Sequence, residues 1–365
     1  MSCSIFDKFL ILLRAGLWEN QPPGNPNLFS LESEEWNYLY NLSKAHTVEG
    51  IIYEGILKLP SEFYPPFNLL LKWTAVIDGI ERYNLKMKNT MIDMAHSLKN
   101  HGSSVVLLKG FGLGNNYIKP NLRISGDVDF YFETKMDFDL AIDYLQKNNI
   151  AYKNGDHGSI YYKYNNTEFE HHVKMIDLFN PFVRKSLKDI ENIERGNYTY
   201  LDKEKFNISI PSYNIMQIQA NAHILKHFLG FGIGLRQFCD VARLCSIDTE
   251  NYNGKVLKNY FKKLKIYKWI ELVFSFLINH LGLPKNNIPF EITLNEDTDW
   301  LKDEILNSGN FGFYQQSFNR GGNLERESSR SDFFNRVLPH LKKGLKYCPY
   351  EAVFYPISKI YTKLT

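Results

Sequence analysis

Two aspartates, Asp127 and Asp129, are separated by one residue in the segment Gly126-Asp127-Val128-Asp129. The branched and aromatic residues around them indicate a strand, and side chains at positions i and i+2 of a strand project from the same face. Two carboxylates at this spacing suit divalent metal ions, which clamp the attacking and leaving oxygens in phosphoryl transfer. Magnesium is the expected metal, because it prefers oxygen ligands together with substrate phosphates.

A third acid is expected from a β-hairpin in residues 159–175. Its turn is predicted at Asn165-Asn166, because asparagine accepts the positive φ angles of a tight hairpin turn. In the second arm Glu168 and Glu170 share the polar face, and Glu170 is the better placed to complete the metal site. Glu168 and Asp177 remain alternatives, with Asp177 ranked last because it has the opposite strand parity from Glu170.

Two histidines follow Glu170 in the same arm. His172 shares the face of Glu170 and is expected near the acids. His171 points to the opposite face and is expected to pack in the interior, since adjacent residues of a strand face opposite ways.

A phosphate-binding turn is expected upstream of the two aspartates. The apolar run 104–108 has the composition of a central strand and ends at Lys109-Gly110. A glycine at this turn lets backbone N–H groups approach a phosphate closely, and the start of a following helix adds a favourable dipole. Lys109 and Arg123 would add positive charge for a triphosphate.

The predicted elements that position these residues form three regions. Helical periodicity dominates residues 1–80, with one segment ending at Pro60 and a long helix over about 67–100. The strands and an amphipathic helix over about 136–150 follow, and helical periodicity returns near residue 211 and continues with breaks to the C-terminus. The sequence therefore predicts an α+β fold: a helical N-terminal arm (1–80), a small mixed-sheet α/β core (81–205) and a helical C-terminal domain (206–365).

The strand that carries the aspartates is expected to bury only one face. Val128, Phe130 and Phe132 would hold it in the sheet, while Asp127 and Asp129 face a cleft. An acid costs several kcal/mol to bury without a partner, so a face open to a cleft, where a metal ion would offset the repulsion of the two acids, would explain both carboxylates.

The composition limits the class of protein. The 365 residues are 44% hydrophobic and 23% charged, as in ordinary globular proteins, and the net charge is +3. Without a Lys/Arg block there is no strong nucleic-acid signal. The four cysteines form no CxxC pair, which favours a reducing cytoplasm over a disulfide framework. Charged residues interrupt the apolar segments near residues 5–18 and 269–284, so no membrane span is expected.

Two further patterns lie in the predicted C-terminal domain. His223 and His227 are spaced i, i+4 on a helix, but no glutamate follows His223, so the HExxH metal signature is absent and cleft-lining or packed roles are favoured. Arg236 and Asp240 would either face the cleft or form an i, i+4 pair.

The order of these motifs resembles a known superfamily. Leu108-Lys109-Gly110, Tyr117, Arg123 and Gly126-Asp127-Val128-Asp129 follow one another as in the nucleotidyltransferases related to DNA polymerase β, and more narrowly as in the uncharacterised nucleotidyltransferase family. The segment 168–182, with an acid-x-His strand, and the segment 230–244 resemble the same family. The similarity covers roughly residues 35–285.

The resemblance implies transfer of a nucleoside monophosphate from an NTP such as ATP to an acceptor hydroxyl, with two Mg²⁺ ions. Asp127 and Asp129 would be metal ligands, and Glu170 the third ligand or the base. The nucleotide would be bound by a set of residues around these acids: Lys109, Gly110, Arg123, Gly126 and His172. The acceptor, a small molecule or a macromolecule, is not specified. A catalytically degenerate nucleotide- or partner-binding protein on the same fold is the alternative.

Overall fold

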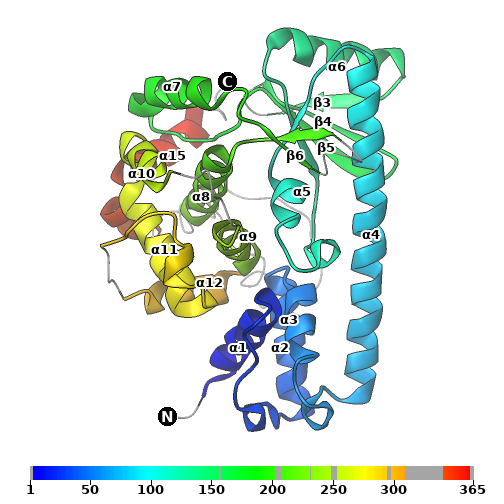
Figure 1. Cartoon of the computed structure of the whole chain (residues 1–365), viewed down its shortest axis with the longest axis vertical. Coiled ribbons are helices and arrows are strands. Elements are labelled where there is room, and N and C mark those ends of the chain that lie inside the picture. Colours follow the sequence, from blue (N-terminus) through cyan, green and yellow to red (C-terminus); the bar gives the residue numbers. More distant parts are fainter. Residues whose placement is uncertain are drawn as a thin grey trace.

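The computed structural model describes residues 3–155, 158–201, 207–230, 232–247, 253–293, 297–309 and 340–361. The fold is α+β, as predicted. It has one mixed seven-stranded sheet, and helices precede, separate and follow the strands in the sequence. The N-terminal helices lie at one end of the molecule and the strands toward the other end, where further helices flank the sheet (Figure 1). The helical periodicity expected over 310–339 lies outside the described residues.

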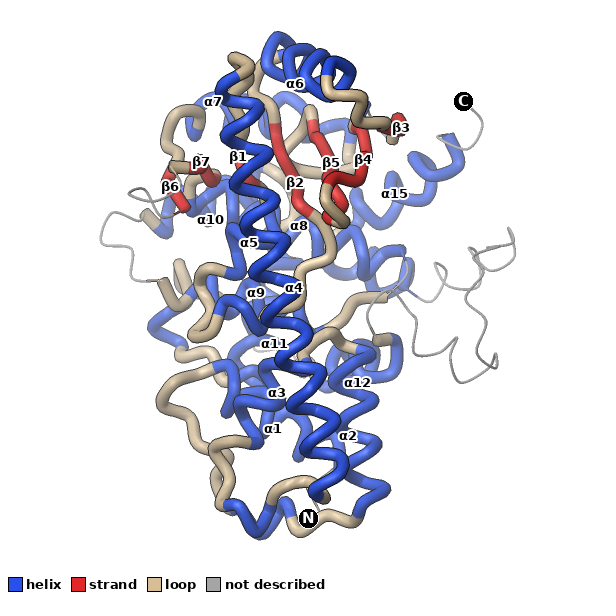
Figure 2. The backbone as a smooth tube through the Cα atoms, turned by 90° about the vertical axis from the view of Figure 1, so that its right-hand side faces the viewer, coloured by secondary structure: helices blue, strands red, loops and turns tan. Residues whose placement is uncertain are grey.

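The N-terminal helices are α1 (Ile5–Leu17), η1 (Pro26–Phe29), α2 (Ser33–Ala45), α3 (Glu49–Ile56) and η2 (Ser61–Phe63). The helical segment ending at Pro60 is thus two helices, with Thr47 between them at a φ of +54°. The next helix, α4 (Phe67–Asn100), has the bounds expected from the sequence. It runs along the length of the molecule from the N-terminal helices to the sheet (Figure 2).

The sheet has the strand order β3-β4-β5-β2-β1-β7-β6. Its strands are β1 (Val106–Leu107), β2 (Val128–Tyr131), β3 (Tyr152–Asn154), β4 (Ile160–Tyr164), β5 (Thr167–His172), β6 (Thr199–Leu201) and β7 (Ile208–Ile210). β2 pairs antiparallel with β1 and parallel with β5, so it lies at the centre. Between β1 and β2 lie α5 (Lys109–Gly114) and η3 (Pro120–Leu122), and α6 (Lys135–Lys147) follows β2.

The hairpin of β4 and β5 is confirmed. Asn165 and Asn166 have φ angles of +48° and +64°, as a tight turn requires. β3, β6 and β7 were not predicted, nor was α7 (Arg184–Glu194), which follows η5 (Pro181–Val183).

The later helices are α8 (Tyr213–Gly230), α9 (Leu235–Cys245), α10 (Gly254–Lys263), α11 (Tyr267–Leu281), η6 (Lys285–Asn287), α12 (Asp299–Ser308) and α15 (Pro349–Tyr361). α8 and α9 contact each other and also α5, which begins directly after the residue that follows β1 (Figure 1). α11 is buried along most of its length. Among the described residues, no helix is both long and apolar enough to cross a membrane.

The expectation that β2 buries only one face is wrong. Val128 and Phe130 are buried on one face, but Asp129 and Tyr131 on the other face are also buried, with Asp129 only 4% exposed. The neighbouring strands β1 and β5 place β2 in the middle of the sheet, and Lys109 and His172 lie against the Asp129 carboxylate. The charge of Asp129 must therefore be offset by partners rather than by water.

Candidate active site

Asp129 and Glu170 are neighbours across the β2–β5 pairing, and His172 lies two residues farther along β5. The ligand atoms of Asp129, Glu170 and His172 all lie within 4.8 Å of one another. His172 Nε2 donates to Asp129 Oδ1 at 2.6 Å and lies 3.4 Å from Glu170 Oε2. Strand alternation produces this arrangement, because the register turns all three side chains to the same face.

Lys109 approaches the same cluster from the end of β1. Its Nζ lies 3.6 Å from Asp129 Oδ1. Burial alone would raise the pKa of Asp129, but Lys109 and the hydrogen bond from His172 lower it well below its ordinary value. Asp129 is therefore a buried carboxylate that stays ionised through two neighbours.

Asp127 precedes β2 and is exposed, outside the three-residue cluster. Desolvation by the surrounding protein and the charge of Asp129 raise the pKa of Asp127 to about 6. Two carboxylates separated by one residue thus differ in proton affinity, and a nearby positive charge would favour ionisation of both.

The turn after β1 is sharp, as expected. Lys109 and Gly110 have φ angles of +33° and +26°, and a Cβ added to Gly110 would lie 3.4 Å from the carbonyl oxygen of Asp127. The turn therefore lies against the segment that carries Asp127. The backbone N–H of Lys109 donates to Gln219 Oε1 of α8 at 3.3 Å, so α8 fixes the turn from the other side.

Arg123 is buried and engaged with α9. Its Nε and Nη2 donate to Asp240 at 2.9 and 2.7 Å, and its Nη1 donates to Ser125 Oγ at 3.0 Å. Tyr117 donates to the same carboxylate at 2.7 Å. Asp240 thus joins two residues of the expected motif, and the Arg123 guanidinium orients the segment before Asp127. Its role toward a nucleotide stays a prediction.

Arg236 donates from Nη1 to the carbonyl oxygen of Ile124 at 2.7 Å. Arg236 and Arg123 therefore both bond the carbonyl oxygen of Ile124, two residues before Gly126. The connection of Asp240 to Arg123 spans 117 residues, and no local sequence signal predicts it.

The alternative third acids lie elsewhere. Glu168 is exposed and faces Lys163 across the hairpin, and Asp177 forms an ion pair with Lys226 of α8 at 2.7 Å. Lys226 lowers the pKa of Asp177 to about 2 despite burial. Of the three acids considered, Glu170 is the one that the structure brings next to Asp129.

Both strand histidines lie as their parity predicts. His171 is fully buried, and its ring lies 4.7 Å from that of Phe132, centroid to centroid. Burial lowers the pKa of His171 to about 3.

The two histidines of the i, i+4 pattern, His223 and His227, lie on α8 with their ring centroids 4.4 Å apart. Desolvation lowers the pKa of both, that of His227 to about 3.

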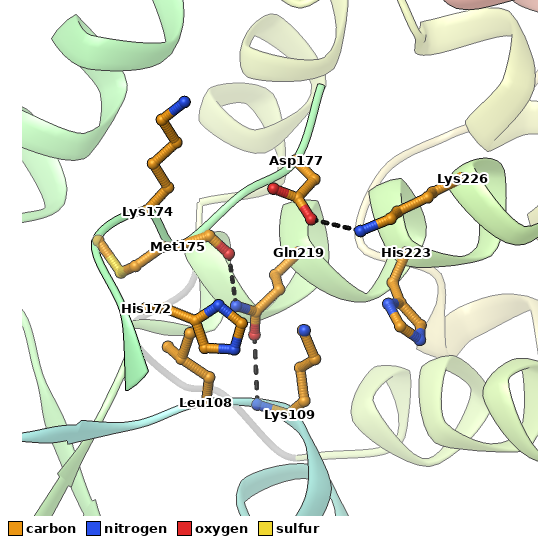
Figure 3. Close-up of a pocket in the computed structure, with 9 residues that line it drawn as sticks. All are labelled: Leu108, Lys109, His172, Lys174, Met175, Asp177, Gln219, His223 and Lys226. Carbon is orange, nitrogen blue, oxygen red and sulfur yellow. Dashed lines mark hydrogen bonds and ion pairs between the residues drawn. The ribbon is translucent and has the colours of Figure 1, made fainter. Parts of the chain in front are cut away.

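A pocket opens between the end of β5 and α8, next to the acid cluster (Figure 3). It is lined by Leu108, Lys109, His172, Lys174, Met175, Asp177, Gln219, His223 and Lys226. Gln219 crosses its floor: its Nε2 donates to the carbonyl oxygen of Met175 at 2.6 Å, and its Oε1 accepts from Lys109. Sequence reasoning did not single out Gln219 or Lys226, although Lys226 lies within the histidine pattern 223–227.

The fold and the acid cluster define a mixed α/β protein with a carboxylate site at the centre of its sheet. A family model described as "Uncharacterised nucleotidyltransferase" matches residues 32–277, more than half of the chain, and contains every site residue described above. The chain belongs to this nucleotidyltransferase family. Comparisons with curated proteins and with solved structures found no match.

Proposed function

We propose that this protein transfers a nucleoside monophosphate from an NTP to an acceptor hydroxyl, with Mg²⁺ bound by the acids of β2 and β5. The observation that carries the proposal is the convergence of the ligand atoms of Asp129, Glu170 and His172 within 4.8 Å of one another, with Asp127 directly before the strand that carries Asp129. Membership of the nucleotidyltransferase family supports the general class of reaction.

The donor groups fit a divalent cation. The carboxylates of Asp127, Asp129 and Glu170 offer the oxygen ligands that Mg²⁺ prefers. His172 holds Asp129 through its 2.6 Å hydrogen bond, as residues that orient metal ligands commonly do. When bound, the metal would neutralise charge that develops on the transferred phosphoryl group and its leaving oxygen.

The protein's own side chains take part in the proposed reaction by accepting a proton and by supplying a positive charge. In the proposed reaction, the acceptor oxygen forms a bond to the α-phosphorus, the bond from that phosphorus to the bridging oxygen breaks, and pyrophosphate leaves. The acceptor proton passes to the Glu170 carboxylate. Lys109, which lies 3.6 Å from Asp129, supplies a positive charge next to the reacting groups.

The first test is nucleotide binding. Purified protein is expected to melt at a higher temperature with MgATP, MgGTP, MgCTP or MgUTP than with the nucleotide and EDTA. Asp129→Asn should lose this Mg²⁺-dependent shift, whereas Asp93→Asn, at an exposed position of α4, should retain it. An unchanged melting temperature with every NTP and metal combination would contradict the proposal.

The second test separates an enzyme from a degenerate binding protein. Pyrophosphate release and transfer of label from an [α-³²P]NTP would be followed with a cell extract as the source of acceptors. Wild-type protein should label an acceptor and Asp129→Asn should not. Binding of Mg-NTP without pyrophosphate release under any of these conditions would favour the binding protein.

A further inference from the structure

A run of lysines covers the outer side of α10, the turn after it and the start of α11. It consists of Lys255, Lys258, Lys262, Lys263, Lys265 and Lys268, and no aspartate or glutamate occurs between residues 251 and 270. Apolar residues interrupt the lysines in the sequence, but the helix separates the two kinds. Leu257, Tyr260 and Phe261 are buried, whereas the lysines of the run are exposed or half-buried. The structure thus gathers a positive charge that the sequence disperses.

A second lysine run lies next to the first, although about 75 residues separate them in the sequence. It consists of Lys342, Lys343 and Lys346 in the helical segment 340–347. The two runs meet at Tyr347, because Lys268 Nζ and Lys346 Nζ lie 5.6 and 4.8 Å from the centroid of its ring. Lys343 Nζ lies 4.3 Å from the ring centroid of Trp300, which stacks on Tyr347. The two runs together are called the lysine face.

Lysines on an amphipathic helix often do no more than face water. Here, however, the positive charges are not balanced locally. Among the described residues, no lysine of the α10–α11 run forms an ion pair with a carboxylate. Lys258 donates to the main-chain carbonyl oxygen of Glu291 at 2.9 Å. Charges of one sign gathered on a surface repel one another and attract a ligand of the opposite sign.

Aromatic rings lie among these lysines. Lys258 Nζ and Lys262 Nζ are 5.5 and 5.4 Å from the ring centroid of Tyr267. Tyr267 and Trp300 are both half-buried, so part of each ring is open to solvent. Lysines that follow a phosphate backbone, combined with rings on which bases stack, are typical of surfaces that bind single-stranded nucleic acids.

A membrane surface is a less suitable partner. Helices that lie on membranes combine their lysines with exposed large apolar side chains. Among the described residues of α10, no large apolar side chain is exposed. Leu345 of the second run is 50% exposed, and a single exposed leucine is common on any protein surface.

We propose that the lysine face is a docking surface for a single-stranded nucleic acid, whose phosphates contact the lysines of α10, of the start of α11 and of segment 340–347. Because the face extends over three separate segments, it suits an extended chain of phosphates better than a small anion. α10 lies on the opposite side of the molecule from α4 (Figure 1). The inference does not depend on the proposed nucleotidyl transfer.

The test is fluorescence anisotropy with labelled oligo(U) and oligo(dT) of about 20 nucleotides at a series of salt concentrations. The logarithm of the association constant should fall linearly with the logarithm of the salt concentration, by about 0.7 for each phosphate contacted. A triple variant, Lys262→Gln with Lys263→Gln and Lys265→Gln, removes three exposed charges. Its slope should be smaller by about 2, which corresponds to about a hundredfold weaker binding at 0.1 M salt when the two lines meet at 1 M.

The charge-matched control is Lys72→Gln with Lys99→Gln and Lys135→Gln, at exposed positions of α4 and α6. It should bind both oligonucleotides as the wild type does. Melting temperatures check the fold of both triple variants, and both should keep the Mg-NTP shift of the wild type.

Three results would overturn the inference. The first is a wild-type protein that binds neither oligonucleotide at 0.05 M salt, an ionic strength at which phosphate contacts are strong. The second is an equal loss of binding in the two triple variants, because the lysine face would then have no special role. The third is binding of phosphatidylserine vesicles without binding of either oligonucleotide, which would assign the lysine face to a lipid surface. Preference for oligo(U) or for oligo(dT) would support the inference and identify the strand as RNA or DNA.

Discussion

Asp129 and Glu170 lie side by side on the parallel strands β2 and β5, as direct register partners at the centre of the sheet. His172 bonds the first of these carboxylates and lies 3.4 Å from the second. The pair is thus an acid cluster built by strand register alone, and a shift of one residue in β5 would turn Glu170 to the opposite face.

Glu170→Gln is expected to lower the rate of nucleotidyl transfer by at least about a hundredfold, because the proposed site loses the carboxylate that takes the acceptor proton or binds metal. The amide has nearly the same shape, so the fold should be retained. Transfer of label from an [α-³²P]NTP measures the rate, and circular dichroism and melting temperature check the fold.

The matched control is Glu168→Gln, on the same strand and the same parity but exposed and facing Lys163. It is expected to keep the wild-type rate. If Glu168→Gln loses activity while Glu170→Gln keeps it, the third carboxylate has been assigned to the wrong residue.

Much of the fold was predictable because its signals are local. The apolar spacing and the terminating Gly102 predict the bounds of α4, and Asn165-Asn166 specify the hairpin turn. β6 and β7 carry no such signal. They are three residues each, and β7 becomes a strand by pairing with β1, where Val106 is the partner of Ser209. A contact between residues so distant in sequence depends on the tertiary fold, so propensity does not reveal it.

The candidate site, like the fold, has features that local sequence signals predict and features that depend on the tertiary fold. Strand parity predicts that Glu170 and His172 share a face, and these two side chains lie next to Asp129. Asp127 precedes β2 and lies outside this cluster, so its role at the site stays a prediction.

The burial of Asp129 was not predictable from parity, because it depends on the flanking strands and on the side chains of Lys109 and His172 that lie against it. The partners of Arg123 were hidden for the same reason, since Asp240 comes from a helix more than 100 residues later.

Asp240→Asn is expected to lower the free energy of unfolding by about 3–5 kcal/mol, because Arg123 would keep a buried charge without its carboxylate partner. The pair is buried on both sides, and Tyr117 loses the same acceptor charge. Urea denaturation followed by fluorescence measures the change. The double variant Arg123→Met with Asp240→Leu should lose less than the sum of the single losses.

An exposed ion pair provides the comparison. Asp78→Asn removes the partner of Arg82 on the surface of α4 and should change the free energy of unfolding by less than about 1 kcal/mol. A loss for Asp240→Asn as small as that for Asp78→Asn would show that the Arg123 guanidinium does not depend on this carboxylate. Arg123 would then be open to the role in nucleotide binding expected from the motif.

His46 is expected to make the protein sensitive to acid. It is buried against Phe9, and the backbone N–H of Leu235 donates to its Nδ1 at 3.4 Å. Burial lowers the pKa of His46 from its ordinary 6.5 to about 4. Between these values the unfolded chain binds a proton that the folded protein does not, so stability falls as pH decreases through this window. The shift corresponds to about 3 kcal/mol between pH 7 and pH 4.

Glu49 is the matched control, because its titration changes the free energy of unfolding with pH in the opposite direction. Burial raises the pKa of Glu49 to about 7, so the folded protein holds a proton that the unfolded chain releases, and this stability is lost as pH rises from about 4.5 to 7. Urea denaturation of wild type, His46→Gln and Glu49→Gln at pH 4 to 7.5 measures both. The stability difference between wild type and His46→Gln should shrink as pH falls, and that between wild type and Glu49→Gln should shrink as pH rises. Two difference curves that are flat, or that slope the same way, would show that burial does not set the protonation of these groups.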